Sequence, residues 1–271
     1  NLMRSLDIST RAHNTCTFTT TASPKDPRQE DQFRVRHIEQ GTTGRRYIRE
    51  GKLGDPFDRG GRRLLAVQDN VLTVLGSEAG RLYGFPIERF TRFWFLCGEH
   101  VLFIVDAVTS TEPVRTTWHW LLNNRDGGLD LKVFKPDRLI ARRGDAGLKL
   151  FHLGDGTLSG PTYAYVHDAY HPLPNQRGEG KPGSGLLMEW REPEPHTERL
   201  VTHAIAVDSY GAIAGWHITR DDDSVALTGP RHGQQWMLEI TNEPLSFVIR
   251  QPERASYRIT EEADTWQLTE I

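Results

Sequence analysis

Histidine is the residue type in this sequence that best suits proton transfer. An imidazole has a pKa of about 6.5, so a histidine can take or give a proton near neutral pH. Eleven histidines are present, and six lie in or beside segments of alternating polarity: His13, His37, His119, His152, His203 and His217. A histidine in such a segment is usually structural. His13 differs because it starts a Thr-rich segment and has the amide of Asn14 beside it, which favours an imidazole that faces a cleft.

Other common catalytic motifs are missing from the sequence. It has no Gly-rich phosphate loop after a predicted strand, no Gly-x-Ser-x-Gly, no His-Glu-x-x-His and no paired Cys-x-x-Cys. These absences argue against nucleotide binding, serine hydrolysis of the common type and zinc-finger chemistry.

Charge gives a second clue. The formal net charge is −3 and acidic residues are interspersed among the basic ones, which argues against a nucleic-acid partner. Six lysines leave 27 arginines among the 33 basic residues. Guanidinium groups bind carboxylate and sulfate in two-pronged fashion, although a GC-rich genome produces the same bias. No apolar run reaches the ~20 residues of a membrane span, and no charged-then-apolar leader begins the sequence.

The elements that must position His13 are predicted to be strands. The clearest pair is a hairpin of residues 92–97 and 101–108, joined by Gly98-Glu99-His100. No segment keeps a helical period, and Gly, Pro, Asn and Asp separate the other candidates: 15–21, 33–39, 64–67, 71–75, 115–122, 129–134, 138–141, 148–153, 162–166, 185–190, 199–207, 212–219, 224–228, 235–240, 245–249, 255–260 and 265–268.

This spacing predicts an all-β chain, a two-layer antiparallel β-sandwich of many short strands forming one domain over residues 1–271. Its core is expected to include Trp94, Phe95, Phe103, Ile104 and Val105. Residues 171–185 and 41–61 are expected to form long loops, the first a possible hinge. Cys16 and Cys97 could pair in an oxidising compartment or lie buried as small apolar groups.

An ordered set of segments resembles the C-terminal β-sandwich domain of the heparinase II/III-like polysaccharide lyases. The set comprises Ala-His-Asn-Thr at 12–15, Arg-Phe-Trp-Phe at 92–95 with Val-Asp-Ala-Val at 105–108, and Thr-Thr-Trp-His-Trp-Leu at 116–121. Glu-Trp-Arg-Glu-Pro-Glu-Pro at 189–195 is similar to a further segment of that family. The resemblance covers most of residues 1–200.

The resemblance implies that the chain is a fragment of a larger bacterial enzyme, periplasmic or secreted. Such lyases have an N-terminal α/α toroid upstream, which this chain lacks, and they bind an acidic polysaccharide between toroid and sandwich. They remove the C5 proton of a uronic acid and expel the C4 oxygen by β-elimination. His13 would then be the base or the group that neutralises the carboxylate, and Asn14, Arg89 and Arg92 would contact substrate, with Arg62 and Arg63 as further possible contacts. The fragment alone would be inactive.

Cofactors are not expected. Thr15 lies where some family members have a second histidine, and residues 87–90 read Ile-Glu-Arg-Phe in place of a His-Arg-Arg-like triplet, so the resemblance gives no zinc site. Glu88 with Asp26 or Asp31 could instead hold a divalent cation such as calcium.

Two alternatives stay open. His119 lies between Trp118 and Trp120, which could stack on sugar rings or form part of the core. The chain could also be a noncatalytic carbohydrate-binding or domain-docking β-sandwich, which would have no need of His13 in a cleft. A sandwich glycosidase is disfavoured, because Glu189, Glu192 and Glu194 are expected to lie in a loop.

Overall fold

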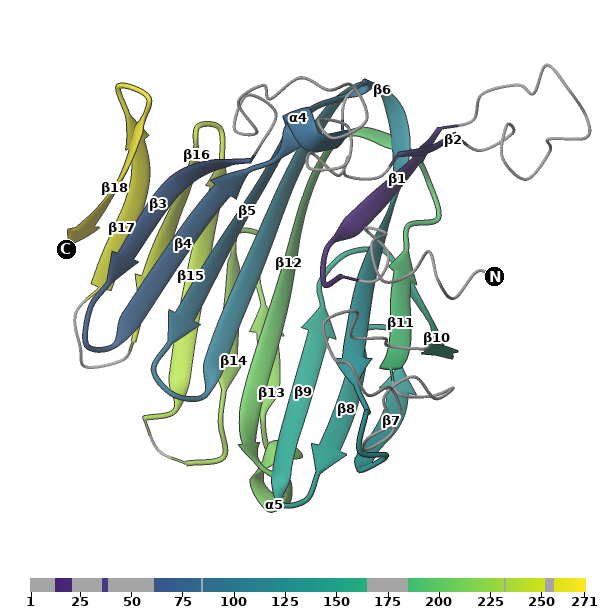
Figure 1. The fold of residues 1–271 in the computed structure, drawn as a ribbon. Coiled ribbons are helices and arrows are strands. Elements are labelled where there is room, and N and C mark those ends of the chain that lie inside the picture. The colour runs from purple at the N-terminus through teal and green to yellow at the C-terminus, as the bar shows by residue number, and fades with distance from the viewer. Residues whose placement is uncertain are drawn as a thin grey trace, which may run out of the picture.

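The computed structural model describes residues 13–20, 36–38, 61–83, 85–164, 185–231, 233–251 and 256–271, and their secondary structure is almost entirely β (Figure 1). The elements, in chain order, are β1 (Cys16–Thr20), β2 (Arg36–Ile38), β3 (Arg62–Gln68), β4 (Leu72–Glu78), α4 (Gly80–Tyr83), β5 (Ile87–Cys97), β6 (Val101–Asn123), β7 (Leu129–Lys135), β8 (Arg138–Arg143), β9 (Ala146–His152), β10 (Thr157–Ala164), β11 (Gly185–Arg191), β12 (His196–Ser209), α5 (Tyr210–Ile213), β13 (His217–Arg220), β14 (Ser224–Thr228), β15 (Gln235–Asn242), β16 (Leu245–Arg250), β17 (Ser256–Glu262) and β18 (Thr265–Glu270).

The strands form two antiparallel sheets, which confirms the predicted sandwich. The larger, 12-stranded sheet runs in the order β3-β4-β5-β6-β12-β9-β8-β7, with β1, β2, β10 and β11 attached beside β6. The smaller sheet is a meander of six strands, β13 to β18. The predicted hairpin is β5 and β6, closed where Cys97 pairs with Val101.

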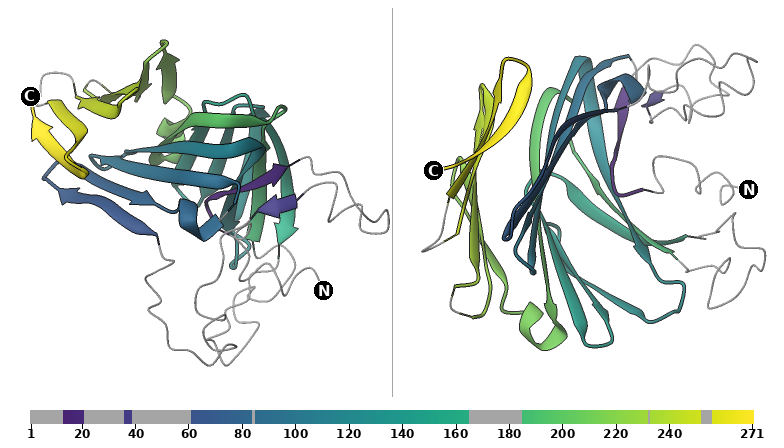
Figure 2. Two further views of the ribbon diagram at one scale, coloured as in Figure 1. Left: turned by 90° about the horizontal axis from the view of Figure 1, so that it is seen from above. Right: turned by 60° about the vertical axis from the view of Figure 1, so that its left-hand side comes forward.

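Strand β6 differs most from the sequence prediction. It is one strand of 23 residues, where two strands at 101–108 and 115–122 were predicted. Its first half pairs with β5 and β12, and its second half pairs with β1 and β11. A straight strand would hold Asp106 and Trp118 about 40 Å apart. Trp118 Nε1 nevertheless donates a hydrogen bond to Asp106 Oδ2 at 2.9 Å, so β6 bends back on itself. The second half of β6, with the strands attached to it, therefore folds over the central strands of the larger sheet (Figure 2).

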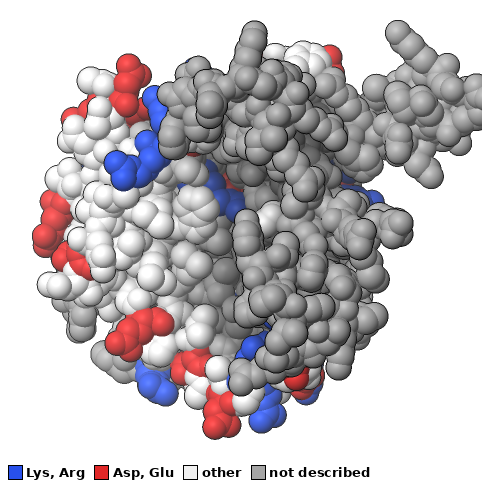
Figure 3. Space-filling view, viewed as in Figure 1, with Lys and Arg blue, Asp and Glu red and all other residues white. Residues whose placement is uncertain are grey.

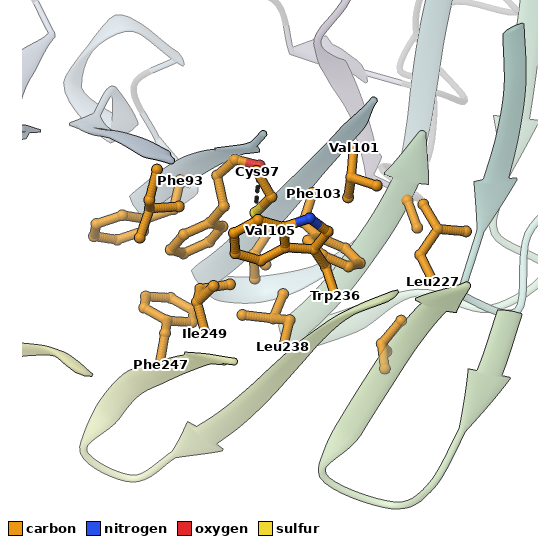
Figure 4. Close-up of a cluster of buried hydrophobic side chains, with 14 of the residues drawn as sticks. Phe93, Cys97, Val101, Phe103, Val105, Leu227, Trp236, Leu238, Phe247 and Ile249 are labelled. Atoms are coloured by element: carbon orange, nitrogen blue, oxygen red, sulfur yellow. Dashed lines mark hydrogen bonds between the residues drawn. The ribbon is translucent and has the colours of Figure 1, made fainter. Parts of the chain in front are cut away.

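The bend creates a second hydrophobic core. One core lies between the central strands and the six-stranded sheet, where Phe93 of β5 packs against Phe247 (Figure 4). Trp266 of β18 also packs against Phe93. The other lies between the central strands and the part of the sheet folded over them, and it includes Phe18, Phe90, Ile104, Trp118 and Trp190. Strand β5 contributes to both cores, because Phe93 and Phe95 lie in the first and Phe90 lies in the second.

Four of the five predicted core residues are buried. Phe95, Phe103 and Val105 belong to the first core and Ile104 belongs to the second. Trp94 is half-buried and packs against the second core.

The segment 212–219 was predicted to be one strand, and only its end, residues 217–219, is strand. The chain instead forms the short helix α5 and then β13, and so passes from β12 of the larger sheet to the smaller sheet. Ile213 and Trp216 are three residues apart, the spacing of one helical turn, and both are buried in the first core. Trp216 Nε1 donates to Asp208 Oδ2 at 3.0 Å, which fixes this crossing.

Three further expectations concern loops and cysteines. Glu189 lies in β11, which confirms the strand predicted at 185–190 and not the loop expected for the three glutamates. Nearly all of 171–185 and 41–61 lies outside the described residues. Cys16 and Cys97 are both free, and because they belong to cores on opposite faces of the central strands they do not form a disulfide. Burial raises the pKa of both thiols.

Gly76 tests the packing of β4 on β5. It pairs with Phe93, and a methyl group at residue 76 would lie 2.5 Å from a carbon of the buried Phe93 ring. We expect Gly76→Ala to lower the free energy of unfolding by about 1–3 kcal/mol in urea titration. Gly211→Ala is the matched control, since nothing lies within 4 Å of its added carbon. Equal unfolding midpoints for the two variants would show that Phe93 is not held in this place.

Candidate functional site

His13 and Asn14 lie exposed in the turn that precedes β1. The ladder between β1 and β6 reaches this turn, because His119 N–H donates to the Thr15 carbonyl at 2.8 Å. One step further, Leu121 N–H donates to Asn14 Oδ1, also at 2.8 Å. The side-chain oxygen of Asn14 therefore takes the place of the main-chain carbonyl that would accept the next hydrogen bond of the ladder.

Arg92 of β5 holds the same turn from inside the protein. Its Nη1 donates to the Asn14 carbonyl at 2.5 Å, while Nε and Nη2 donate to the two oxygens of Asp106 at 2.5 and 2.6 Å. Arg92 is 5% exposed and Asp106 is fully buried. Burial by itself would lower the pKa of the guanidinium, but the charge and hydrogen bonds of Asp106 outweigh burial and raise that pKa. The guanidinium is therefore charged, and Arg92 occupies a structural position where a direct contact with substrate was predicted.

Arg89 lies on the other face of the sheet. Its Nε donates to Thr91 Oγ1 at 3.0 Å, and its Nη2 is 4.0 Å from Glu261 of β17. It lines two grooves, of about 360 and 700 Å³, beside the six-stranded sheet. The structure thus brings His13 and Asn14 together and does not bring Arg89 to them.

His119 belongs to a second polar cluster, on the outer face of the folded-over strands. Its Nδ1 is 2.9 Å from Glu189 Oε1 of β11, and its Nε2 is 2.7 Å from Thr17 Oγ1 of β1. A carboxylate beside Nδ1 favours the tautomer with hydrogen on Nδ1, so the Thr17 hydroxyl donates to Nε2. His119 is itself buried, as are Trp118 and Trp120 on the opposite face. Of the two interpretations of these tryptophans, the structure supports the core.

Two histidines that sequence analysis did not bring together form a pair in the second core. His152 of β9 and His203 of β12 are direct cross-strand partners, with Nδ1 of the first 2.9 Å from Nε2 of the second. Burial, followed by the neighbouring His203 and Arg199, lowers the pKa of His152 to about 2. Burial also lowers the pKa of His203. Both rings are therefore neutral in the folded protein.

Packing around this pair is tight. The His152 ring stacks on Trp190 at 5.4 Å between centroids, and Trp118 lies against both histidines. Within the described part of the chain, His152 Nε2 and His203 Nδ1 have no hydrogen-bond partner. A proton added here would have little to stabilise it.

The remaining candidates show structural roles. Glu192 is buried, forms an ion pair with Arg199 and accepts a hydrogen bond from Thr116 N–H at 3.1 Å.

Among the described residues, no group of three or more His, Cys, Asp and Glu side chains is placed to bind a metal ion. Glu88 is exposed, and Asp26 and Asp31 lie outside the described residues, so the calcium hypothesis stays a prediction. No helix in the described ranges is long and apolar enough to cross a membrane.

Comparisons with known proteins give one informative result. No protein-family model and no curated protein matches this sequence. A heparan sulfate lyase, HepC from Pedobacter heparinus, matches in structure with a TM-score of 0.50 at 13% identity. The fold resembles a domain of a heparan sulfate lyase. The match covers 66% of this chain but only 28% of that lyase. A heparinase III gene product matches with a TM-score of 0.47 at 12% identity, over 66% of this chain and 27% of its own.

The buried histidine pair predicts a loss of stability in acid. Both pKa values are depressed in the folded state, so below pH ~6.5 the unfolded chain binds protons that the folded chain does not. The free energy of unfolding should fall as pH falls, by roughly 2 kcal/mol for each histidine by pH 5. Urea titrations from pH 7.5 to 5 measure this slope.

His152→Gln should reduce that pH dependence whatever its own stability. His217→Gln is the control, because His217 is exposed and should keep the wild-type slope. An unfolding free energy that does not change between pH 7.5 and 5 would contradict two neutral buried histidines.

Proposed function

We propose that this chain is the β-sandwich domain of a polysaccharide lyase that cleaves a uronic-acid-containing polymer by β-elimination. The observation that carries the proposal is the exposed His13 beside an amide that the fold anchors by its oxygen. A proton-transfer group and a fixed hydrogen-bond donor are the two kinds of group this reaction needs from one wall of a cleft. The fold shared with HepC supports the architecture of such a domain.

Asn14 supplies the donor. Because Leu121 N–H can only donate, the atom that faces it is the amide oxygen, and the two hydrogens on Nδ2 then face away. They have no partner among the described residues, and Asn14 is exposed. Hydrogen bonds from Nδ2 to a uronate carboxylate would stabilise the negative charge that spreads onto it when the C5 proton leaves.

His13 supplies proton transfer or charge neutralisation. As the base, neutral imidazole takes the C5 proton, the C5–H electrons form the C4–C5 double bond, and the C4–O bond breaks with its electrons on the leaving oxygen. As an imidazolium, His13 would instead pair with the carboxylate beside C5. The group that protonates the leaving oxygen, and the base if His13 is not one, belong to a toroid domain upstream in this proposal.

Location and partners follow from the same proposal. Since this chain covers 28% of the lyase it resembles, we infer that it works with an N-terminal α/α toroid and that the polymer lies between the two. A bacterial enzyme for glycosaminoglycan, alginate or a related polymer would act in the periplasm or after secretion.

The alternative is a noncatalytic sandwich that docks a glycan or another domain, and one observation favours it. Leu75 and Leu96, on β4 and β5, are 46% and 48% exposed, and half-buried Trp94 and Leu102 lie in the same region. This face of the sheet is largely uncharged in Figure 3. An apolar face of this kind suits docking, and the docking function would be independent of His13.

His13→Ala, made in the complete protein with its upstream region, tests the lyase function. The rate of double-bond formation, followed by ultraviolet absorbance, should fall by at least about two orders of magnitude, because one acid–base or charge-stabilising group is lost. The melting temperature should change little, since His13 is exposed. His217→Ala, at another exposed histidine, is the control. Normal turnover by folded His13→Ala would exclude His13 from catalysis and favour the docking alternative.

The chain by itself tests how the site is divided. Residues 1–271 given acidic polysaccharides should produce no measurable rise in the absorbance of unsaturated uronates, because groups of the toroid are absent. Mixing the chain with a separately expressed upstream region should restore the rise. Robust turnover by residues 1–271 alone would show that the whole catalytic set lies in this chain.

A further inference from the structure

We infer that Arg92 is a positioning residue, which locks the exposed His13–Asn14 turn to the protein interior. The inference rests on the proposed function only in taking that turn to be catalytic. Arg92 bridges the carbonyl of Asn14 and both oxygens of Asp106, with three bonds of 2.5–2.6 Å.

The bridge is rigid at its inner end. Arg92 and Asp106 are direct cross-strand partners on β5 and β6, and Asp106 also accepts from Trp118 Nε1 of the bent-back half of β6. Arg92 further lies over the ring of Trp94, with its guanidinium carbon 5.8 Å from the ring centroid. These contacts fix the position of the guanidinium, and its bond to the Asn14 carbonyl therefore fixes the position of Asn14.

The turn has its second attachment at Leu121. The carbonyl of Asn14 is held by Arg92 and its side-chain oxygen by Leu121 N–H, so one residue is fixed on two sides. Two attachments define the direction of the Asn14 Nδ2 group and limit the paths open to His13, the preceding residue. Rigid support of this kind determines rates, because a displacement of about 1 Å at a catalytic group can cost ~10²-fold.

Fold stability alone does not explain the buried charges. Replacing a buried ion pair by apolar residues of similar volume is often neutral or stabilising, so two apolar side chains would serve the core at least as well. Apolar side chains cannot donate to an exposed turn. The N–H donors of a guanidinium lie in a fixed plane, so two of them can bind a carboxylate while a third binds a carbonyl oxygen.

A second arginine–carboxylate pair provides a matched control. Arg199 pairs with the buried Glu192 and with Asp155, at 2.7 Å to the latter, and contacts no residue of the turn in any bond described above. Arg199→Lys therefore imposes the same chemical change, a fork replaced by an ammonium group, without touching Asn14. Arg92→Lys keeps the charge opposite Asp106, but one ammonium cannot reproduce the bidentate pair and the bond to Asn14.

The first measurement is amide hydrogen exchange at Leu121 in the 271-residue chain. Arg92→Lys and Asn14→Ala should each speed this exchange by at least about tenfold beyond any change in global unfolding. Asn14→Asp keeps the acceptor oxygen and should preserve protection, as should Arg199→Lys. If Arg92→Lys does not fold, Trp118→Phe removes the third donor to Asp106 and should give a smaller acceleration. Unchanged protection in the folded variants would overturn the inference.

The second measurement is steady-state kinetics of the complete enzyme. Arg92→Lys should lower kcat by at least about tenfold with KM changed by less than about threefold, while Arg199→Lys should leave both near wild type. Equal kinetic effects of the two lysine variants would reduce Arg92 to a general stabiliser and overturn the positioning role. A wild-type protein without lyase activity would contradict the proposed function, and the exchange experiment would still decide whether Arg92 holds the turn.

Discussion

The carboxylate of Asp106 joins the parts of the larger sheet. It is fully buried and accepts hydrogen bonds from Arg92 on β5 and from Trp118 on the bent-back half of β6. A buried carboxylate costs several kcal/mol unless its lone pairs are satisfied. Moving either strand away inside the folded protein would leave this charge buried without its hydrogen-bond donors. The second core and the attachment of β1 both depend on the bend that brings Trp118 to Asp106.

Local patterns in the sequence account for half of this interaction. Residues 98–100 close a hairpin between two apolar runs, and counting back from the turn pairs Arg92 with Asp106, as the structure has it. No pattern predicts that Trp118 reaches the same carboxylate. The exposed residues 111–113 separate the two strands predicted at 101–108 and 115–122, but the alternation does not show that the chain runs across them as one bent strand. The all-β class was therefore predictable, while the second core was not. The segment containing Ile213 and Trp216 was misread as strand because a helix of one turn is too short to show a helical period in the sequence.

The candidate site divides in the same way. His13 was found because its neighbours in sequence single it out. The pairs His152–His203 and His119–Glu189 depend on which strands lie side by side, across separations of 51 and 70 residues that no local pattern encodes. Strand order is a tertiary property, and a single sequence shows the residues of each strand without their partners.

Arg89 and Arg92 show how strand geometry limits function here. They are three residues apart, yet the bulge between Ile87 and Arg89 and the alternation of β5 direct one toward the six-stranded sheet and the other into the second core. Arg92 is thereby used up in interior contacts, while Arg89 stays partly exposed beside the six-stranded sheet, away from His13. An exposed group close to the second core can then come from a place where a ladder ends. The turn before β1 is such a place, and the Asn14 side chain extends the ladder by one bond, so an exposed histidine lies next to a residue that the sheet holds in place.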